Sequence, residues 1–213
     1  MDRLEPPHLR PLLAALRTQF EEGRARKDAI GDEIRAVSVA LSRLSEPEPA
    51  DATHHPLTRY LPVAIALSKS NAPDVVSVLA PLANSLPWRY GYAPRADVRG
   101  LESAMGWAEI VGPKAPFHSD EVCFGLTLIG PQIYYPPHHH PAKELYFVLA
   151  GRAAWTAEQT AILPPGAYIL HEPDIVHAMR TREEPLLAIY SWTGDVVSPS
   201  AWAGERHAGE ASI

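Results

Sequence analysis

The stretch YYPPHHHPAKELYFVLAG, residues 134–151, brings together the residue types of a metal site. His138 and His140 are two residues apart, so on an extended chain both side chains point to the same side. Glu144 follows His140 after three residues, and Tyr146 shares the side of Glu144 on the next strand. Imidazole and carboxylate groups together suit a divalent first-row metal and leave coordination positions for water or substrate. The stretch therefore predicts a metal site built on His138, His140 and Glu144.

A fourth ligand is expected from a distant strand. His177, in the run LPPGAYILHEPDIVHAM, is the first candidate, and His171 is the second. His139 lies between two histidines that share a side, so its side chain is expected to point away. The remaining histidines have no partner at ligand spacing, and surface or loop roles are predicted for them: His8, His54, His55, His118 and His207.

The sequence around this stretch divides into three segments. Residues 1–88 are predicted to form a helical segment, because apolar residues recur at three- and four-residue steps with charges between them. From residue 89 to 198, short β-rich runs alternate with proline- and glycine-rich turns, which predicts an all-β sandwich or barrel. Residues 199–213 are small and polar and are predicted to form a flexible tail. The β-rich runs are 107–112, 122–129, 144–150, 167–170 and 186–192.

Two parts of the β-rich segment match a known sequence pattern. The resemblance is to the two cupin motifs and covers residues 107–192. It implies a mainly β fold, a cupin double-stranded β-helix barrel with the metal inside, preceded by the helical segment. Two positions depart from the pattern: Gln132 stands where a glycine is expected, and Thr181 where an asparagine is expected. The matching parts are His138-x-His140-x3-Glu144-x6-Gly151 and Pro164-x-Gly166 followed by His177.

Two tyrosines narrow the resemblance. Tyr135 precedes the histidines, and Tyr146 follows Glu144 by two residues. With the helical segment and the HAM run at His177, this order is similar to the cupin-type dimethylsulfoniopropionate (DMSP) lyases. That resemblance implies β-elimination of DMSP to dimethyl sulfide and acrylate, with Tyr146 as general base and Tyr135 assisting. It also implies that the metal ligands are His138 or His140, together with Glu144 and His177.

The proposed chemistry explains why these residue types are needed. A base must remove a proton α to the substrate carboxylate, but a free tyrosine titrates near 10. Lowering that pKa by about three units takes roughly 4 kcal/mol of preferential stabilisation of the phenolate, which a nearby divalent cation can supply. The sulfonium charge favours aromatic walls through cation–π contact. Candidates for such walls, with ordinary core packing as the alternative for each, are Tyr134, Trp155, Tyr190 and Trp192.

The cofactor expected is one divalent transition metal, Zn²⁺ or Fe²⁺, with Mn²⁺, Co²⁺ and Ni²⁺ also compatible with such ligands. Two other functions share the same site. An iron-dependent cupin dioxygenase would use these ligands and O2, and a non-catalytic cupin would bind a small molecule without turnover. Arg89, near the junction of the first two segments, is a candidate to pair with a carboxylate, although a structural hinge is the simpler interpretation.

Composition limits the partners. The net charge of −6 and a pI near 5.9 give no basic surface for nucleic acid. Neither a secretory signal nor a transmembrane stretch is recognisable, so a cytoplasmic location is expected. The resemblance to the DMSP lyases implies that the partner is a small sulfonium carboxylate substrate. The single cysteine, Cys123, lies between apolar residues and is predicted to be buried. Leu145, Phe147 and Leu149 form a second apolar face that needs cover from the helices or from a second subunit in a homodimer.

Overall fold

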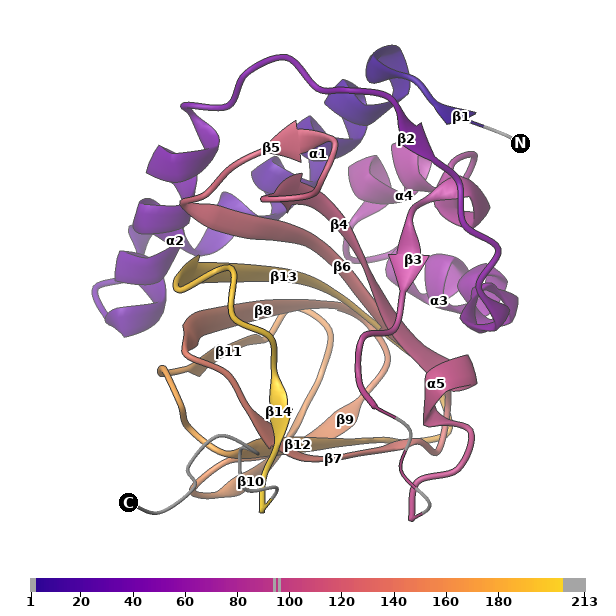
Figure 1. Ribbon diagram of the computed structural model, residues 1–213, viewed down its shortest axis with the longest axis vertical. Helices are drawn as coiled ribbons and strands as arrows, with labels where there is room; N and C mark the ends of the chain where they lie inside the picture. The colour runs from indigo at the N-terminus through magenta and orange to yellow at the C-terminus, as the bar shows by residue number, and fades with distance from the viewer. Residues whose placement is uncertain (1–2, 94, 96, 205–213) are drawn as a thin grey trace, which may run out of the picture.

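The computed structural model describes residues 3–93, 95 and 97–204. Two β-sheets face each other, and a layer of helices covers the outer face of the larger one (Figure 1). The fold is mainly β with an N-terminal helical segment, as the sequence predicts. No helix within the described ranges is long and apolar enough to cross a membrane.

The helical layer is built from the first third of the chain. Prolines occupy the first positions of the first α-helix, where the missing N–H costs no hydrogen bond. The Asp28 side chain caps the second helix by accepting a hydrogen bond from Gly31 N at 3.1 Å. The helices are α1 Pro6–Phe20, η1 Glu21–Ala25, α2 Ala29–Leu41, η2 Pro56–Tyr60, α3 Leu61–Ser68, α4 Pro73–Leu79, η3 Ala83–Ser85 and the later α5 Leu101–Ala104.

The larger sheet has seven strands. Its order is β11-β8-β13-β6-β4-β3, and β5 pairs with β4 in parallel while the other pairs are antiparallel. All five β-rich runs predicted from the sequence fall in this sheet. Its strands are β3 Trp88–Arg89, β4 Met105–Gly112, β5 Phe117–His118, β6 Val122–Ile129, β8 Ala142–Ala150, β11 Tyr168–His171 and β13 Leu186–Gly194.

The smaller sheet has five strands in the order β10-β9-β12-β7-β14, all antiparallel. Sequence periodicity did not single out most of these strands, because they are short and β7 also carries two prolines. They are β7 Tyr134–His139, β9 Ala153–Thr156, β10 Thr160–Leu163, β12 His177–Thr181 and β14 Ala201–Trp202. A separate two-stranded ribbon pairs β1 Arg3–Leu4 with β2 Ala50–Asp51.

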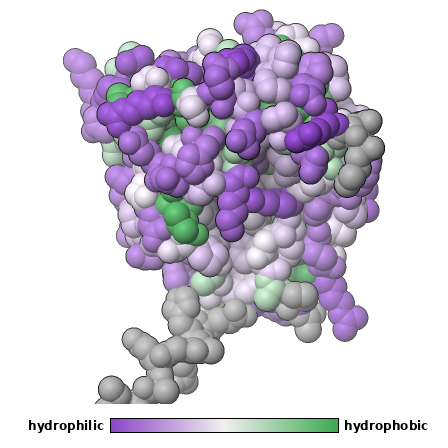
Figure 2. All heavy atoms as spheres, turned by 45° about the horizontal axis from the view of Figure 1, so that its top comes forward, coloured by the Kyte–Doolittle hydropathy of each residue, from purple (hydrophilic) through white to green (hydrophobic). Residues whose placement is uncertain are grey.

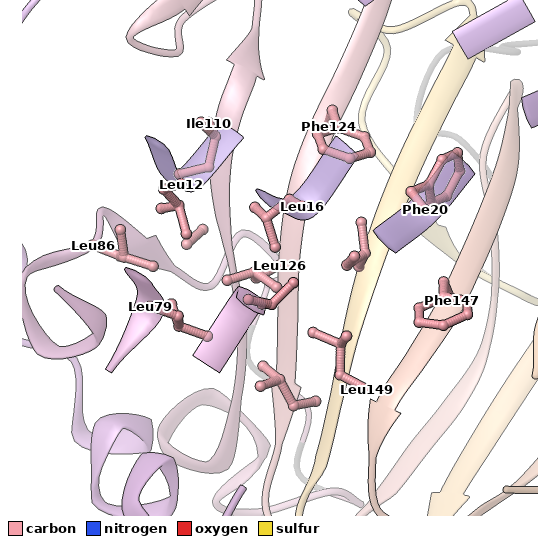
Figure 3. Close-up of a cluster of buried hydrophobic side chains, with 14 of the residues drawn as sticks. Leu12, Leu16, Phe20, Leu79, Leu86, Ile110, Phe124, Leu126, Phe147 and Leu149 are labelled. Atoms are coloured by element: carbon pink, nitrogen blue, oxygen red, sulfur yellow. The ribbon is translucent and has the colours of Figure 1, made fainter. Parts of the chain in front are cut away.

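The helices cover the outer apolar face of the larger sheet. This confirms the first of the two alternatives expected for that face, the helices or a second subunit. Figure 3 shows Leu16 and Phe20 of α1 lying over Phe124 of β6 and Phe147 of β8. The Phe20 and Phe124 rings meet edge to face with centroids 5.4 Å apart. The opposite side of the helical layer is mainly hydrophilic, with apolar residues only in small patches (Figure 2). The helices and the sheet therefore share one core.

The predicted segment boundaries can be compared with these elements. β3, at residues 88–89, pairs with β4, so the chain enters the larger sheet close to the predicted boundary. The predicted flexible tail contains β14, which pairs with β7, and Trp202 is buried. The small polar residues around this single tryptophan gave no strand signal. Residues 205–213 of that tail lie outside the described residues.

Candidate active site

Strand register brings the predicted site residues into the space between the two sheets. On β8, Glu144 is paired with His171 of β11 on one side and with Trp192 of β13 on the other. In the smaller sheet, His138 of β7 is paired with His177 of β12. The side chains of these residues are buried or nearly so. The two sheets therefore present histidines and a carboxylate to each other.

Three of the predicted ligands form a compact group. His140, Glu144 and His177 each place one ligand atom so that these atoms lie within 4.8 Å of one another. Nε2 of His140 lies 3.2 Å from Oε2 of Glu144, and Nε2 of His177 lies 3.3 Å from the same oxygen. The other ring nitrogens face backbone oxygens: Nδ1 of His140 is 3.0 Å from Ala142 O, and Nδ1 of His177 is 2.9 Å from Ile175 O. These contacts orient both Nε2 atoms toward the carboxylate.

This group fits one divalent metal ion. Nε2 of His177 is buried and has no hydrogen-bond partner, which is costly unless a ligand occupies the site. Two imidazoles and a carboxylate that converge with their outer nitrogens already engaged are typical of a metal centre with open positions. The structure thus supports a single-metal site at His140, Glu144 and His177 and does not select the metal.

The other two candidate histidines lie beside this group. His138 turns its Nδ1 toward Pro136 O at 2.8 Å and stacks on the Tyr135 ring with centroids 3.9 Å apart. It is not part of the compact group. His171, the second candidate for the distant ligand, places Nδ1 3.2 Å from Oε2 of Glu144. It contacts the carboxylate from the side opposite Trp192.

The electrostatics of the group favour an anionic Glu144. Burial opposes ionisation of this carboxyl, but the charge of His140 and hydrogen bonds from His140 and His171 hold its pKa well below the usual value. Burial lowers the pKa of His140, but the Glu144 carboxylate raises it by more, so the pKa of this imidazole is above its ordinary value. Burial, aided by repulsion from His177, keeps the pKa of His138 well below normal. Glu144 is therefore the anion of the ligand group, and the neighbouring His138 is neutral.

A cavity of about 440 Å³ opens onto this group. Tyr135, Tyr146, Tyr190 and Trp192 all line it, as do His138, His140 and Glu144. Tyr134, also expected as a wall, is 36% exposed and lies under the Arg180 guanidinium, 4.3 Å from its ring centroid. Trp155 is buried against Tyr146, with ring centroids 5.0 Å apart, and is not among the lining residues. Two of the four aromatic candidates thus lie outside the cavity wall.

Tyr146 is placed beside the carboxylate of the ligand group. Burial, followed by the charge of Glu144 and a hydrogen bond with it, raises the pKa of Tyr146 well above its ordinary value. A hydrogen bond with Thr127 acts in the opposite direction. Without a cation, the surrounding residues therefore keep the phenol protonated. A positive charge beside Glu144 would oppose the effect of that carboxylate and lower the pKa of Tyr146.

Two functional contacts escaped the sequence analysis. Trp192, expected as a wall, also donates a hydrogen bond from Nε1 to Oε1 of Glu144 at 2.7 Å. Tyr92 shares a short hydrogen bond with the Tyr135 hydroxyl and stacks on Trp202 with ring centroids 4.2 Å apart. Burial raises the pKa of Tyr135 well above normal, and Tyr92 adds to the effect. No local signal marks Tyr92, because a loop far from the histidine stretch in sequence brings it to the cavity.

The Arg89 side chain also reaches the cavity, where it pairs with a carboxylate. Its Nη2 lies 2.9 Å from Oε2 of Glu109. Cys123 is buried as predicted, and it also lines the cavity wall.

Comparison with known proteins identifies the family. The model of the dimethylsulfoniopropionate (DMSP) lyase family matches residues 32–188, more than half of the chain. The chain belongs to the DMSP lyase family. The resemblance noted in the sequence is thereby confirmed.

Two curated relatives show how far the similarity to other DMSP lyase family members extends. DddL from Cereibacter sphaeroides is 35% identical over 144 residues, which cover 65% of this chain and 60% of DddL. The dimethylsulfoniopropionate lyase DddQ from Ruegeria pomeroyi is 27% identical over 188 residues, or 87% of this chain and 91% of DddQ. The chain thus spans 60% of the length of one of these relatives and nearly all of the other.

Solved structures of DMSP lyases share the fold of this family member. A chain from the crystal structures of the DMSP lyases RdDddP and RnDddQII superposes with a TM-score of 0.78 at 26% identity, covering 92% of this chain and 98% of that one. DddQ from Ruegeria pomeroyi DSS-3 superposes with a TM-score of 0.70 at 25% identity, covering 92% and 96%. The cupin-like barrel with an N-terminal helical segment is therefore confirmed.

Proposed function

We propose that this chain is a metal-dependent DMSP lyase that eliminates dimethyl sulfide from its substrate with Tyr146 as general base. The observation that carries the proposal is the position of Tyr146. It lines the cavity, follows Glu144 by two residues on β8, and is within hydrogen-bonding reach of that carboxylate. Membership of the DMSP lyase family supplies the substrate class.

The metal would be held by His140, Glu144 and His177. When bound, a divalent ion supplies Lewis-acid chemistry and a positive charge, which favours both the acidity of the α-proton and the phenolate form of Tyr146. Trp192 and His171 contact Glu144 from either side and fix the orientation of its two oxygens. These contacts hold the ligand group in shape before the substrate arrives.

The elimination then needs one base and no acid. The Tyr146 phenolate oxygen takes the proton from the carbon α to the carboxylate. The electrons of that C–H bond form the C=C bond of acrylate, and the C–S electrons leave with neutral dimethyl sulfide. Because the departing thioether carries no charge, no proton has to be delivered to it. The products are dimethyl sulfide, acrylate and one proton held at first by Tyr146.

The remaining cavity residues bind and orient. Tyr190 and Trp192 present aromatic surface to a cationic substrate, as the cation–π argument requires. Tyr135 is held by Tyr92 and by stacking on His138, so it lies at the cavity wall in a fixed position. It would assist by orienting the substrate beside Tyr146. Its raised pKa keeps its hydroxyl protonated and able to donate a hydrogen bond.

Headspace gas chromatography for dimethyl sulfide, combined with acrylate determination, tests this proposal. Metal-loaded protein given DMSP should release both products in equal amounts, and a chelator should abolish release. Equal release under strict anaerobiosis separates the lyase from an iron-dependent dioxygenase, which would need O2. Binding of DMSP without products under any metal would instead indicate a non-catalytic cupin and would contradict the proposal.

Several finer expectations remain predictions from the sequence. They are the choice among Zn²⁺, Fe²⁺, Mn²⁺, Co²⁺ and Ni²⁺, a cytoplasmic location, and a homodimer. Metal analysis of protein purified without added metal addresses the first of these.

A further inference from the structure

A second carboxylate lines the cavity away from the metal group. Glu109 of β4 is buried, with its side chain 10% exposed, and it belongs to the cavity wall. It lies on a different strand from any member of the ligand group, at a β-bulge where the register of β4 against β6 shifts between Glu109 and Val111. Bulges of this kind are common beside active sites, where they redirect a side chain.

Strand register places Glu109 in the same row as Tyr146. Glu109 is paired with Gly125 of β6, Gly125 with Tyr190 of β13, and Tyr190 with Tyr146 of β8. Gly125 has no side chain, so Tyr190 reaches across β6 and its hydroxyl donates a hydrogen bond to Oε2 of Glu109 at 3.3 Å. Paired residues on neighbouring strands therefore connect Tyr146, the candidate base, to the buried carboxylate of Glu109.

The two members of the ion pair between Arg89 and Glu109 are buried to different extents. Nη2 of Arg89 lies 2.9 Å from Oε2 of Glu109, but the Arg89 side chain is 44% exposed and the Glu109 side chain only 10%. The carboxylate is thus the more buried member of the pair, and both side chains line the cavity. Water screens the more exposed guanidinium more strongly than it screens the buried carboxylate.

The walls beside Glu109 are aromatic. Trp107, two residues earlier on β4, and Tyr190, which hydrogen-bonds Glu109, line the same cavity. Aromatic faces attract cations such as a sulfonium and do not attract carboxylates. A carboxylate with aromatic neighbours is therefore suited to the positive end of a small molecule whose negative end lies at the metal group.

We propose that Glu109 binds the cationic end of the substrate and so determines the preference for substrates that carry a positive charge opposite their carboxylate. This inference rests on the proposed function, because it takes the carboxylate of the substrate to be bound near the metal group. Arg89 is the competing cation: it shares Oε2 of Glu109 and weakens the attraction for any cation inside the cavity. The two residues should therefore affect cation binding in opposite directions.

A pair of ligands of equal shape tests this inference without turnover. One is trimethylammonio-propanoate, a zwitterion, and the other is its carbon analogue, in which an uncharged quaternary carbon replaces the nitrogen and only the carboxylate is charged. Calorimetry on metal-loaded protein measures the ratio of their dissociation constants. Wild-type protein should prefer the ammonium ligand, Glu109→Gln should lower that preference by about tenfold, and Arg89→Gln should increase it. Glu109→Gln should not weaken binding of the carbon analogue, because that ligand has no positive charge for Glu109 to attract.

Glu121→Gln is the matched control, because Glu121 is also paired with an arginine, Arg43 at 2.9 Å, but is exposed and outside this cavity. It should leave the ratio unchanged. A wild-type protein that prefers neither ligand, or a Glu109→Gln variant with the wild-type ratio and intact metal content, would overturn the inference. Because the readout is binding, it stands apart from the lyase proposal: loss of dimethyl sulfide release alone would contradict only the latter.

Discussion

The indole Nε1 of Trp192 donates a hydrogen bond to Oε1 of Glu144 at 2.7 Å, so the two oxygens of this carboxylate have different partners. Oε1 is engaged by Trp192, whereas the nearby nitrogens of His140 and His177 face Oε2. Trp192 of the larger sheet therefore holds Oε1. His140, in the connection between β7 and β8, and His177, in the smaller sheet, approach Oε2.

Removing the indole donor should weaken metal binding. Trp192→Phe keeps an aromatic wall but leaves Glu144 free to rotate, and loss of such an outer contact typically costs about 10- to 100-fold in metal affinity. Competition against a chromophoric chelator measures the change. Trp155→Phe is the matched control, because the buried Nε1 of Trp155 has no hydrogen-bond partner to lose. Equal affinity in wild type and Trp192→Phe would show that Trp192 acts only as a wall.

The histidines should differ in their importance for the metal. His140→Ala and His177→Ala remove members of the compact group and should reduce bound metal to a small fraction of one ion per chain. His138→Ala should retain most of the metal, because His138 stacks on Tyr135 and lies outside that group. Elemental analysis of the dialysed variants gives the metal content. Loss of metal in His138→Ala, with retention in His140→Ala, would reverse the assignment.

This difference between His138 and His140 shows where sequence reasoning ends. Alternation along an extended chain predicted that both side chains share a side, and β7 ends at His139, so His140 lies in the connection between β7 and β8. Alternation no longer applies there. The places of Glu144 and Tyr146 could be predicted because both lie inside β8, a regular strand, and match a known motif. His177, the first residue of β12, was found by the motif alone.

Other parts of the site depend on long-range packing that no local pattern records. Tyr92 reaches Tyr135 from a loop more than forty residues earlier in the sequence. The pair formed by Arg89 and Glu109 joins two strands through a bulge. In contrast, the helical layer and most strands of the larger sheet follow from hydrophobic periodicity, because one face of each is buried against the other.

The contact between helices and sheet should contribute strongly to stability. Leu16 of α1 is fully buried in the core shown in Figure 3, so Leu16→Ala should lower the free energy of unfolding by about 2–5 kcal/mol. Val39→Ala, at a helical position that is 49% exposed, should change it by less than about 0.5 kcal/mol. Urea unfolding followed by circular dichroism compares the two. A small effect at Leu16 would mean that the helices add little to the stability of the barrel.

A buried carboxyl between α2 and β13 should make stability depend on pH. Burial raises the pKa of Glu33 above its ordinary value of 4.5, although Thr193 donates a hydrogen bond to it. The folded state therefore favours the protonated form, and stability falls as pH rises through the folded pKa. Glu33→Gln should raise Tm at neutral pH and leave it unchanged below the ordinary glutamate pKa.

Thermal unfolding at several pH values measures this effect, with Glu183→Gln at an exposed position as the control. The control should not alter the pH profile. A Glu33→Gln variant that is destabilised equally at all pH values would show that the carboxyl is needed for packing and not penalised by its burial.

The central claim is that Tyr146 is the base of a metal-dependent elimination. The most direct test measures dimethyl sulfide release from DMSP by wild type and Tyr146→Phe at equal metal content. Removal of a general base typically costs about 10²- to 10⁴-fold, so the variant should lose at least about 100-fold in turnover while it keeps its metal and fold. Turnover by Tyr146→Phe close to that of wild type would contradict the account.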